Sequence, residues 1–327
     1  MIINTINLST RLLVYSSTRL LINSSTRQLK MNTIKLNSLE AWILAARPKT
    51  LSGAAVPVMI ALALAYADIG GGAFRIIPAC LCMLFAFTMQ IDANFINDYF
   101  DFKKGTDDEL RLGPKRACAQ GWVTMKAMRL AIVMTTALAC VIGVPLIYYG
   151  GWQMVAVGVL CVIFCFLYTT HLSYLGLGDL LVLLFFGLIP VCATYYIQTG
   201  IVSLECLIAS IACGLVIDTL LIVNNYRDRD NDRRTGKMTL VVRIGAKRTE
   251  RLYWLLGAVA CLFGAIFLIS GKYMAFILPV IYLALHTVAW KKMKTINKGF
   301  QLNQILGENA RNMFIYGILT TIGILIS

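Results

Sequence analysis

The sequence predicts an all-α membrane protein in which nine transmembrane helices form one bundle. Of its 327 residues, 58% are hydrophobic and only 14% are charged, whereas a soluble domain is roughly 25% charged. The mean hydropathy is +0.73. The apolar residues also form continuous runs, and runs of about 18 or more residues indicate transmembrane helices rather than a soluble core.

Nine such runs follow one another along the chain. The links after the third, fifth and seventh runs are short and contain glycine, as in Gly150-Gly151, where a helix must end and the chain reverse. The links after the second, sixth and eighth runs are longer and polar. The predicted spans cover about residues 43–67, 76–97, 127–149, 151–170, 179–198, 203–223, 252–270, 273–290 and 310–326.

The segment before the first span has a different character. The triplet Ser-Thr-Arg recurs every eight residues, at Ser9, Ser17 and Ser25. This octamer repeat is too short for a solenoid unit and lacks the apolar region of a signal peptide. We therefore expect residues 1–30 to be disordered or untranslated, with translation beginning at Met31, and residues 31–327 to form a single nine-helix domain.

The basic residues indicate the orientation of the bundle. With nine spans, 28 of the 30 Lys and Arg residues fall on one side of the membrane, and only Arg75 and Lys272 fall on the other. Basic residues near membrane ends favour the cytoplasmic side. The N-terminus is therefore predicted to be cytoplasmic. The net charge of +14 then follows mostly from topology, so it does not require binding of nucleic acid.

The second span ends in a cluster of amide and carboxylate side chains. Asn94, Asp98 and Asp101 follow one another at spacings of four and three residues, which places them on one face of a helix. Oxygen donors without His or Cys suit a hard cation such as Mg²⁺. We interpret these three residues as metal ligands.

A second cluster of the same kind ends the sixth span, on the same predicted side of the membrane. Asn224, Asp228 and Asp232 are spaced four residues apart, and we interpret Asp228 and Asp232 as further metal ligands. Arg and Lys alternate with these carboxylates and would oppose a bare cation. A diphosphate accounts for the acidic and the basic side chains together, because it can bind a metal ion on one side and basic donors on the other. A solvated helix end would explain one such cluster but not two.

Other basic residues fall into two predicted groups. Arg111, Arg116 and Lys237 are expected to close a basic wall over the phosphates. A second group is expected to anchor the membrane surface. Its members are Lys103, Lys104, Arg233, Lys247 and Arg248.

The clusters and their flanking motifs resemble the UbiA superfamily of intramembrane aromatic prenyltransferases, in particular its dihydroxynaphthoate branch. The resemblance covers about residues 40–326. The matching motifs are Ala46-Arg47-Pro48-Lys49-Thr50-Leu51, Asn97-Asp98-Tyr99-Phe100-Asp101, Arg111-x-Gly113-Pro114-x-Arg116, Tyr174-x-Gly176-Leu177-Gly178-Asp179, Asn224-Asn225-Tyr226-Arg227-Asp228-x-x-x-Asp232 and Gly236-Lys237.

This resemblance implies an activity. A polyprenyl chain would pass from polyprenyl diphosphate to 1,4-dihydroxy-2-naphthoate with loss of CO₂, giving demethylmenaquinone in menaquinone biosynthesis. Asp98, Asp101, Asp228 and Asp232 would then be catalytic through Mg²⁺, and Arg227 would join the residues that bind the diphosphate. Arg47, Lys49 and Tyr168 are the acceptor-binding candidates. The implied location is the bacterial inner membrane, with the active-site loops in the cytoplasm and the tail in the bilayer.

Two other functions remain open from the sequence. A prenyltransferase for another aromatic acceptor, such as 4-hydroxybenzoate, has the same metal motifs. A transporter of an anionic lipid is a different class, but transporters place ionisable groups near the bilayer midplane. Here the acidic clusters lie at the ends of spans, so the enzyme is favoured.

Overall fold

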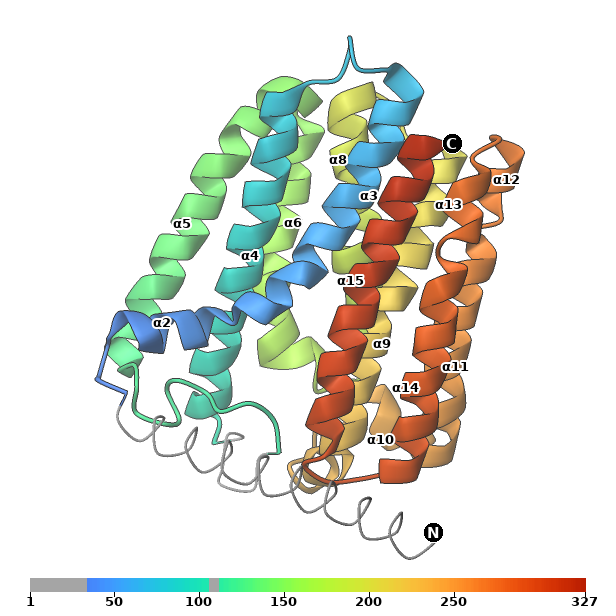
Figure 1. Ribbon diagram of the computed structural model, residues 1–327. Helices are drawn as coiled ribbons and strands as arrows, with labels where there is room; N and C mark the ends of the chain where they lie inside the picture. The colour runs from blue at the N-terminus through green and yellow to red at the C-terminus, as the bar shows by residue number, and fades with distance from the viewer. Residues whose placement is uncertain (1–33, 106–111) are drawn as a thin grey trace, which may run out of the picture.

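The computed structural model describes residues 34–105 and 112–327. Within these ranges the chain is helical without strands, and nine helical segments are long and apolar enough to cross a membrane (Figure 1). The predicted fold class and number of spans are therefore confirmed. The octamer repeat lies outside the described residues.

The helices of the first five spans run in chain order. They are α2 (Leu39–Ala46), η1 (Pro48–Thr50), α3 (Leu51–Ile69), α4 (Ile76–Lys103), α5 (Met125–Gly150), α6 (Gln153–Leu167), η2 (Tyr168–Leu172), α7 (Gly178–Val182), η3 (Leu183–Leu188) and α8 (Ile189–Thr199). The π-helical segment η2 ends the fourth span, and η3 interrupts the fifth. Such segments often accompany functional sites in helices.

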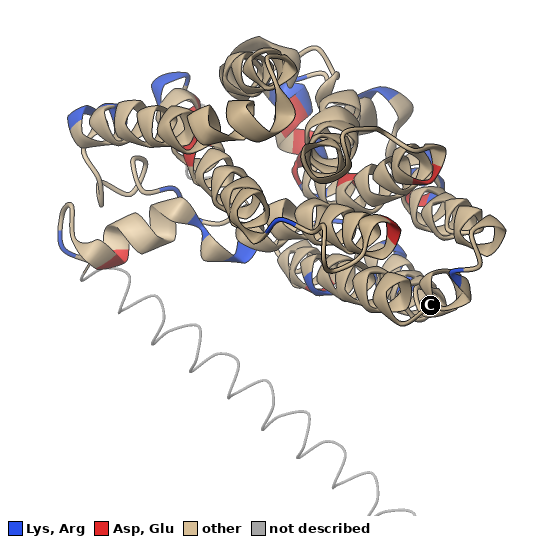
Figure 2. Ribbon diagram, turned by 90° about the horizontal axis from the view of Figure 1, so that it is seen from above, with Lys and Arg blue, Asp and Glu red and all other residues tan. Residues whose placement is uncertain are grey.

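The remaining helices complete the bundle. They are α9 (Leu204–Arg234), α10 (Leu240–Ile244), α11 (Ala246–Phe263), α12 (Ile266–Ile269), α13 (Tyr273–Ile277), α14 (Val280–Ile296) and α15 (Leu302–Ile326). Both α4 and α9 extend past the predicted span ends, so the two acidic clusters are helical, as their spacing requires. Figure 2 shows how little of the described ribbon is charged.

The chain enters the bundle through a sharp corner. Ser38 caps the N-terminus of helix α2, and its hydroxyl accepts a hydrogen bond from the Ala41 amide at 3.3 Å. Arg47 follows the last residue of the helix and has a left-handed backbone with φ of 52°. Figure 1 shows α2 turned away from the direction of α3. The first predicted span therefore began inside α2, because apolar composition does not reveal this corner.

Two glycines allow close packing beside the fifth span. A β-carbon at Gly187 of η3 would lie 2.7 Å from the Ser210 carbonyl oxygen and 2.8 Å from the Cα of Gly214 on α9. Small residues at such positions allow transmembrane helix backbones to approach. The contact fixes η3 against α9.

An ion-pair cluster joins three segments at the end of the bundle opposite α10. The Lys272 ammonium contacts Asp68 on α3 at 3.1 Å and Glu205 on α9 at 2.8 Å. The Tyr195 hydroxyl donates a hydrogen bond to Asp68 at 2.6 Å. Burial alone would lower the pKa of Lys272. The hydrogen bonds to Glu205 and Asp68 have the larger combined effect, so the pKa is raised above the usual 10.5.

We expect Lys272→Met to lower the Tm of purified protein by a few degrees, because Asp68 and Glu205 lose their shared cation. Since the pKa of Lys272 is raised in the fold, its contribution is present at neutral pH and is lost only as pH rises through that pKa. Thermal unfolding at pH 7, with activity unchanged at low temperature, checks this. An unchanged Tm would contradict it.

Candidate functional site

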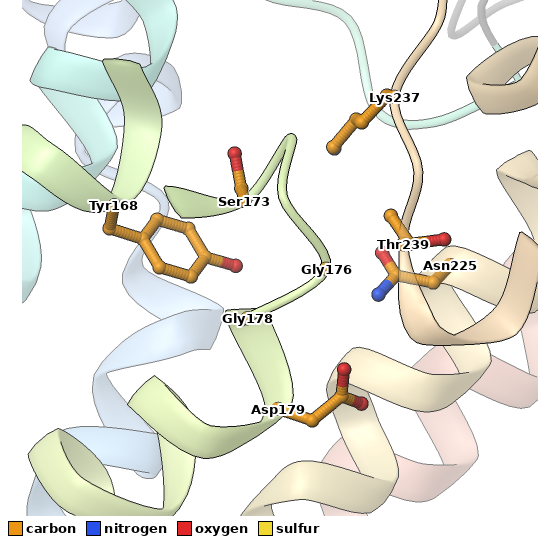
Figure 3. A pocket seen from close by; sticks show the side chains of 8 residues that line it. All are labelled: Tyr168, Ser173, Gly176, Gly178, Asp179, Asn225, Lys237 and Thr239. Atoms are coloured by element: carbon orange, nitrogen blue, oxygen red, sulfur yellow. The ribbon is translucent and has the colours of Figure 1, made fainter. Parts of the chain in front are cut away.

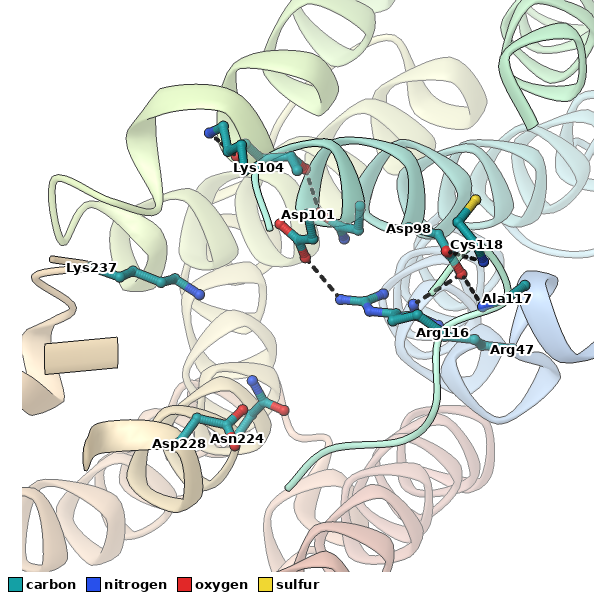
Figure 4. A network of polar contacts seen from close by, with 12 residues as sticks. Arg47, Asp98, Asp101, Lys104, Arg116, Ala117, Cys118, Asn224, Asp228 and Lys237 are labelled. Carbon is teal, nitrogen blue, oxygen red and sulfur yellow. Dashed lines mark hydrogen bonds and ion pairs between the residues drawn. The ribbon is translucent and has the colours of Figure 1, made fainter. Parts of the chain in front are cut away.

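The C-terminal ends of α4 and α9 carry the same pattern, an Asn followed four residues later by an Asp. On α4 the pair is Asn97 and Asp101, and on α9 it is Asn224 and Asp228. Residues four apart project from one helix face. Figure 4 shows Asp101 extending from α4 into the space that also holds Asn224 and Asp228.

Two tyrosines show that the helix ends converge. Tyr168 lines one pocket together with Asn225 of α9 and Lys237. The Tyr174 ring has the Lys104 ammonium 4.1 Å from its centroid and the Lys237 ammonium 6.0 Å from it. Polar and basic groups from four segments therefore surround one space.

Asp101 is paired with a basic residue of the following loop. The Arg116 guanidinium donates to the Asp101 carboxylate at 3.1 Å. Arg116 itself is 7% exposed, so its charge is directed inward. The predicted basic residue and the predicted acidic residue therefore meet at the candidate site.

Asp98 has a different environment. It is fully buried, and its two carboxylate oxygens accept hydrogen bonds from the backbone amides of Ala117 and Cys118, each at 2.9 Å. Arg47 lies 4.0 Å away. Asp98 thus holds the loop that carries Arg116, and Figure 4 shows it on the side of α4 that faces this loop.

Asn94 also points away from the convergence of helices. Its side-chain amide donates to the Ala46 carbonyl and the Thr50 hydroxyl, both at 2.9 Å, and so joins α4 to the corner before α3. Asn97, which the sequence prediction did not include, accepts a hydrogen bond from Thr169 and becomes a further candidate. Its signal was available, because Asn97 and Asp101 repeat the spacing of Asn224 and Asp228.

Arg227 holds the Asn-Asp pair of α9 in place. Its guanidinium donates to both oxygens of Asp228, at 2.8 and 2.5 Å, to Asn224 at 2.8 Å and to Asn303 at 2.9 Å. The side chain is fully enclosed. Asn303 in turn donates to the Leu112 carbonyl at 2.7 Å. Arg227 therefore positions Asn224 and Asp228, and its guanidinium is already surrounded by protein groups.

Asp232 and Lys237 lie next to each other beyond this pair. The Lys237 ammonium is 4.0 Å from Asp232, which is 6% exposed. Lys237 also extends over a small pocket (Figure 3). The pocket is lined by Tyr168, Ser173, Gly176, Gly178, Asp179, Asn225, Lys237 and Thr239.

Lys104 differs from its expected role as a membrane anchor. Its ammonium donates to the Thr170 carbonyl at 2.6 Å and the Thr169 carbonyl at 3.4 Å, and it stacks on Tyr174. Burial lowers its pKa, the neighbouring Lys237 lowers it further, and Asp101 opposes both. Lys104 thus joins α4 to η2 at the edge of the candidate site, because its partners come from a distant part of the chain.

The remaining predicted residues are separated from one another. Arg111 lies outside the described residues. Arg47 is beside Asp98, and Lys49 is exposed on η1. Of the three acceptor candidates, Tyr168 alone lines the pocket that Lys237 covers (Figure 3).

The donors fit Mg²⁺ when it shares its ligands with a phosphate. Amide and carboxylate oxygens face each other from α4 and α9, and Arg116, Lys104 and Lys237 surround them. Among the described residues no three His, Cys, Asp or Glu side chains are close enough to hold a metal by themselves. Mg²⁺ is usually bound by one or two carboxylates together with water and substrate phosphates.

Comparison with known proteins identifies relatives over most of the chain. The profile of the UbiA prenyltransferase family matches residues 54–303. A 1,4-dihydroxy-2-naphthoate octaprenyltransferase of Haemophilus influenzae is 32% identical over 301 residues, which are 88% of this chain and 96% of the relative. The protein of the same description from Escherichia coli K12 is 34% identical over 243 residues, 71% of this chain and 78% of the relative.

The fold has solved counterparts. A UbiA homolog from Archaeoglobus fulgidus, bound to GPP and Mg²⁺, superposes with a TM-score of 0.62 at 14% sequence identity. The match covers 88% of this chain and all of the other. The helical membrane fold is therefore shared.

Proposed function

The chain belongs to the UbiA prenyltransferase family and is an aromatic prenyltransferase embedded in a membrane, and from this premise we propose its substrates. The donor is a polyprenyl diphosphate, and the acceptor is 1,4-dihydroxy-2-naphthoate, which loses CO₂ on prenylation. The reaction is the prenylation step of menaquinone biosynthesis. The observation that carries the proposal is the pair of Asn-x-x-x-Asp helix ends that converge beside basic side chains.

The donor diphosphate would lie between these helix ends. Asn97, Asp101, Asn224 and Asp228 would hold Mg²⁺ together with phosphate oxygens, and Asp232 would complete this set. Mg²⁺ supplies charge neutralisation, which makes diphosphate a better leaving group. We place Asn94 and Asp98 outside the ligand set, since their hydrogen bonds direct them to the α2–α3 corner and to Ala117 and Cys118, whereas Asp101 extends toward Asn224 and Asp228 (Figure 4).

The basic residues act on the same oxygens. Arg116 and Lys237 would donate to the diphosphate and stabilise the charge that grows on the departing oxygen as the allylic C–O bond breaks. Arg111 belongs to this group by sequence. Arg227 acts through Asn224 and Asp228, which it holds in place. It is a positioning residue in this proposal.

The bundle supplies the surroundings that the chemistry needs. The allylic cation must reach the aromatic ring before water does. Apolar span residues exclude water and accommodate the polyprenyl tail, which can extend into the bilayer. Tyr168 faces the space from η2, where its ring can contact the acceptor. The distribution of Lys and Arg supports a cytoplasmic N-terminus and cytoplasmic active-site loops in an inner membrane.

The acceptor assay tests the proposal. Purified protein is given labelled polyprenyl diphosphate and either 1,4-dihydroxy-2-naphthoate or 4-hydroxybenzoate. We expect prenyl transfer to the naphthoate with equimolar release of CO₂ from its labelled carboxylate. Activity should fall more than about 100-fold in EDTA and return with excess Mg²⁺. Transfer to hydroxybenzoate alone, or full activity in EDTA, would contradict the proposal.

A further inference from the structure

Two carboxylates near the candidate site have no role in the mechanism above. They are Asp179 on α7 and Asp218 on α9, and the Oδ1 atom of each has no hydrogen-bond partner among the described residues. Asp218 is only 5% exposed. Burying a polar atom without a partner is costly, and ionisable residues within membrane spans usually serve a function.

The two carboxylates belong to one local group. A β-carbon at Gly178 would lie 3.4 Å from Leu221, so the start of α7 packs closely on α9. Asp218 lies three residues before Leu221, so both residues are on the side of α9 that meets the start of α7. Figure 3 shows Asp179 below Asn225, with its carboxylate pointing toward α9.

Helix α9 presents a second polar face beside the metal-binding one. Asp218, Asn225 and Asp232 are spaced seven residues apart, which is about two helical turns. They therefore form a line along one side of α9. Asn225 lines the pocket above the carboxylate pair, and Asp232 contacts Lys237 beside the diphosphate site.

The pocket is small and lined with polar groups. Its free interior is about 10 Å³, which is roughly the space for one water molecule. The aromatic bicycle of a naphthoate is far larger, so the pocket can receive a single oxygen atom at the edge of the ring. Tyr168, Ser173, Asn225 and Thr239 supply polar side chains around that position.

We propose that this pocket receives a ring hydroxyl of the aromatic acceptor, and that Asp179, which lines the pocket beside Asp218, accepts its hydrogen bond. The inference rests on the proposed function, because it assigns the substrate of the same site. It places the ring between the pocket and the diphosphate, with Lys237 covering both. A phenolic acceptor fits because its O–H group can donate to the unpaired carboxylate oxygen.

The arrangement also assists the reaction. As the ring carbon that bears the carboxylate bonds to the allylic carbon, the C–O bond breaks and its electron pair leaves on the diphosphate. The proton of the neighbouring hydroxyl moves to the Asp179 carboxylate while the ring oxygen becomes a ketone. When the ring carboxylate leaves as CO₂, the electron pair of its bond restores aromaticity, and the proton returns to the ring oxygen. Atoms, charge and protons balance without another reactant.

The experiment compares acceptors in folded variants. Wild type, Asp218→Asn and Asp179→Asn are assayed with 1,4-dihydroxy-2-naphthoate and with the two naphthoates that each lack one ring hydroxyl. The quantity measured is the ratio of kcat/KM between the dihydroxy acceptor and each analogue. Comparing this ratio between proteins removes the intrinsic reactivity of the analogue. The Kd for polyprenyl diphosphate is measured in parallel.

In wild type, the carboxylates should favour the dihydroxy acceptor over the analogue that lacks the hydroxyl they bind, because that analogue leaves them unpaired. For this analogue, we expect both Asp→Asn substitutions to lower the kcat/KM ratio at least about tenfold. The diphosphate Kd should stay within about threefold of wild type. The matched control is Asp92→Asn, because Asp92 is fully buried on α4 and both oxygens are bound by Thr135 and Thr136. Its ratio should remain at the wild-type value.

The outcomes are distinguishable. The first outcome is that the kcat/KM ratios for both analogues stay at the wild-type value in Asp218→Asn and Asp179→Asn. The carboxylate pair then does not bind the hydroxyl, and the hydroxyl assignment is overturned while the proposed function stands. If kcat/KM falls equally with all three acceptors, the carboxylates have a structural role, and the hydroxyl assignment is again overturned. If wild type transfers to no naphthoate, the proposed function is overturned, and this inference with it. Should Asp218→Asn fail to fold, Asp179→Asn decides the question.

Discussion

Asp101→Asn and Asp228→Asn are each expected to reduce prenyl transfer by at least about 1,000-fold in folded protein. Each substitution keeps the shape of the side chain and removes the negative charge that faces the diphosphate site. Asp101 would also lose its charge-assisted contact with Arg116, and Asp228 its contact with Arg227. Single-turnover rates in nanodiscs, at saturating Mg²⁺, measure the effect.

Asp230→Asn is the matched control for this pair. Asp230 is exposed and lies two residues after Asp228, so it projects from a different side of α9. The substitution changes the net charge of the helix end by the same amount, and we expect less than about a threefold change in rate. Equal losses for Asp228→Asn and Asp230→Asn would show that the general charge of the helix end matters, and not the facing pair.

Asp98→Asn should lower activity about 100-fold by a different route. The Asp98 carboxylate accepts two buried backbone amides, from Ala117 and Cys118. An asparagine has one acceptor oxygen, so one amide would face an NH₂ group and lose its partner. The loop would loosen and displace Arg116. We therefore expect the Kd for polyprenyl diphosphate to rise, with an unchanged Mg²⁺ midpoint.

Arg116→Met provides the comparison for Asp98→Asn. If Asp98 acts through the loop, the two substitutions should give the same weakening of diphosphate binding. Combining them should be little worse than either alone, because both affect one interaction. A shift in the Mg²⁺ midpoint as large as that of Asp101→Asn would instead make Asp98 a metal ligand, as its spacing in the sequence predicts.

The fold was accessible from the sequence because lipid imposes a simple rule. Backbone groups within a bilayer must be paired internally, so a long apolar run is a helix. Each of the nine runs corresponds to a helical segment of the described chain. The sequence does not reveal the corner at Arg47 or the π-helical segments η2 and η3. These depend on packing between helices, which composition does not record.

The site was predictable only in part. Helical spacing correctly placed the acidic clusters at the ends of two helices. It could not choose between Asn94 with Asp98 and Asn97 with Asp101, since both pairs are four residues apart. Which pair faces the candidate site depends on the side of α4 that is covered by the loop following this helix. That loop binds Asp98, whereas Asp101 extends toward Asn224 and Asp228 of α9 (Figure 4).

The roles of basic residues depend even more on distant partners. Arg227 is enclosed because Asn303, 76 residues away, completes its coordination. Lys104 turns toward the protein because Thr170 offers a carbonyl and Tyr174 an aromatic face. Local sequence shows only a charged residue near a membrane end, and this pattern is typical of a surface anchor.

The central claim is that the ends of α4 and α9 together form one Mg²⁺-dependent diphosphate site. Its most direct test is the Kd of a non-cleavable polyprenyl diphosphate analogue in nanodiscs, measured with Mg²⁺ and with EDTA. Wild type should bind at least about 100-fold more tightly with Mg²⁺, and Asp101→Asn and Asp228→Asn should each lose most of this enhancement. If either variant keeps the wild-type enhancement while folded, its helix end does not contribute to the site, and the account is contradicted.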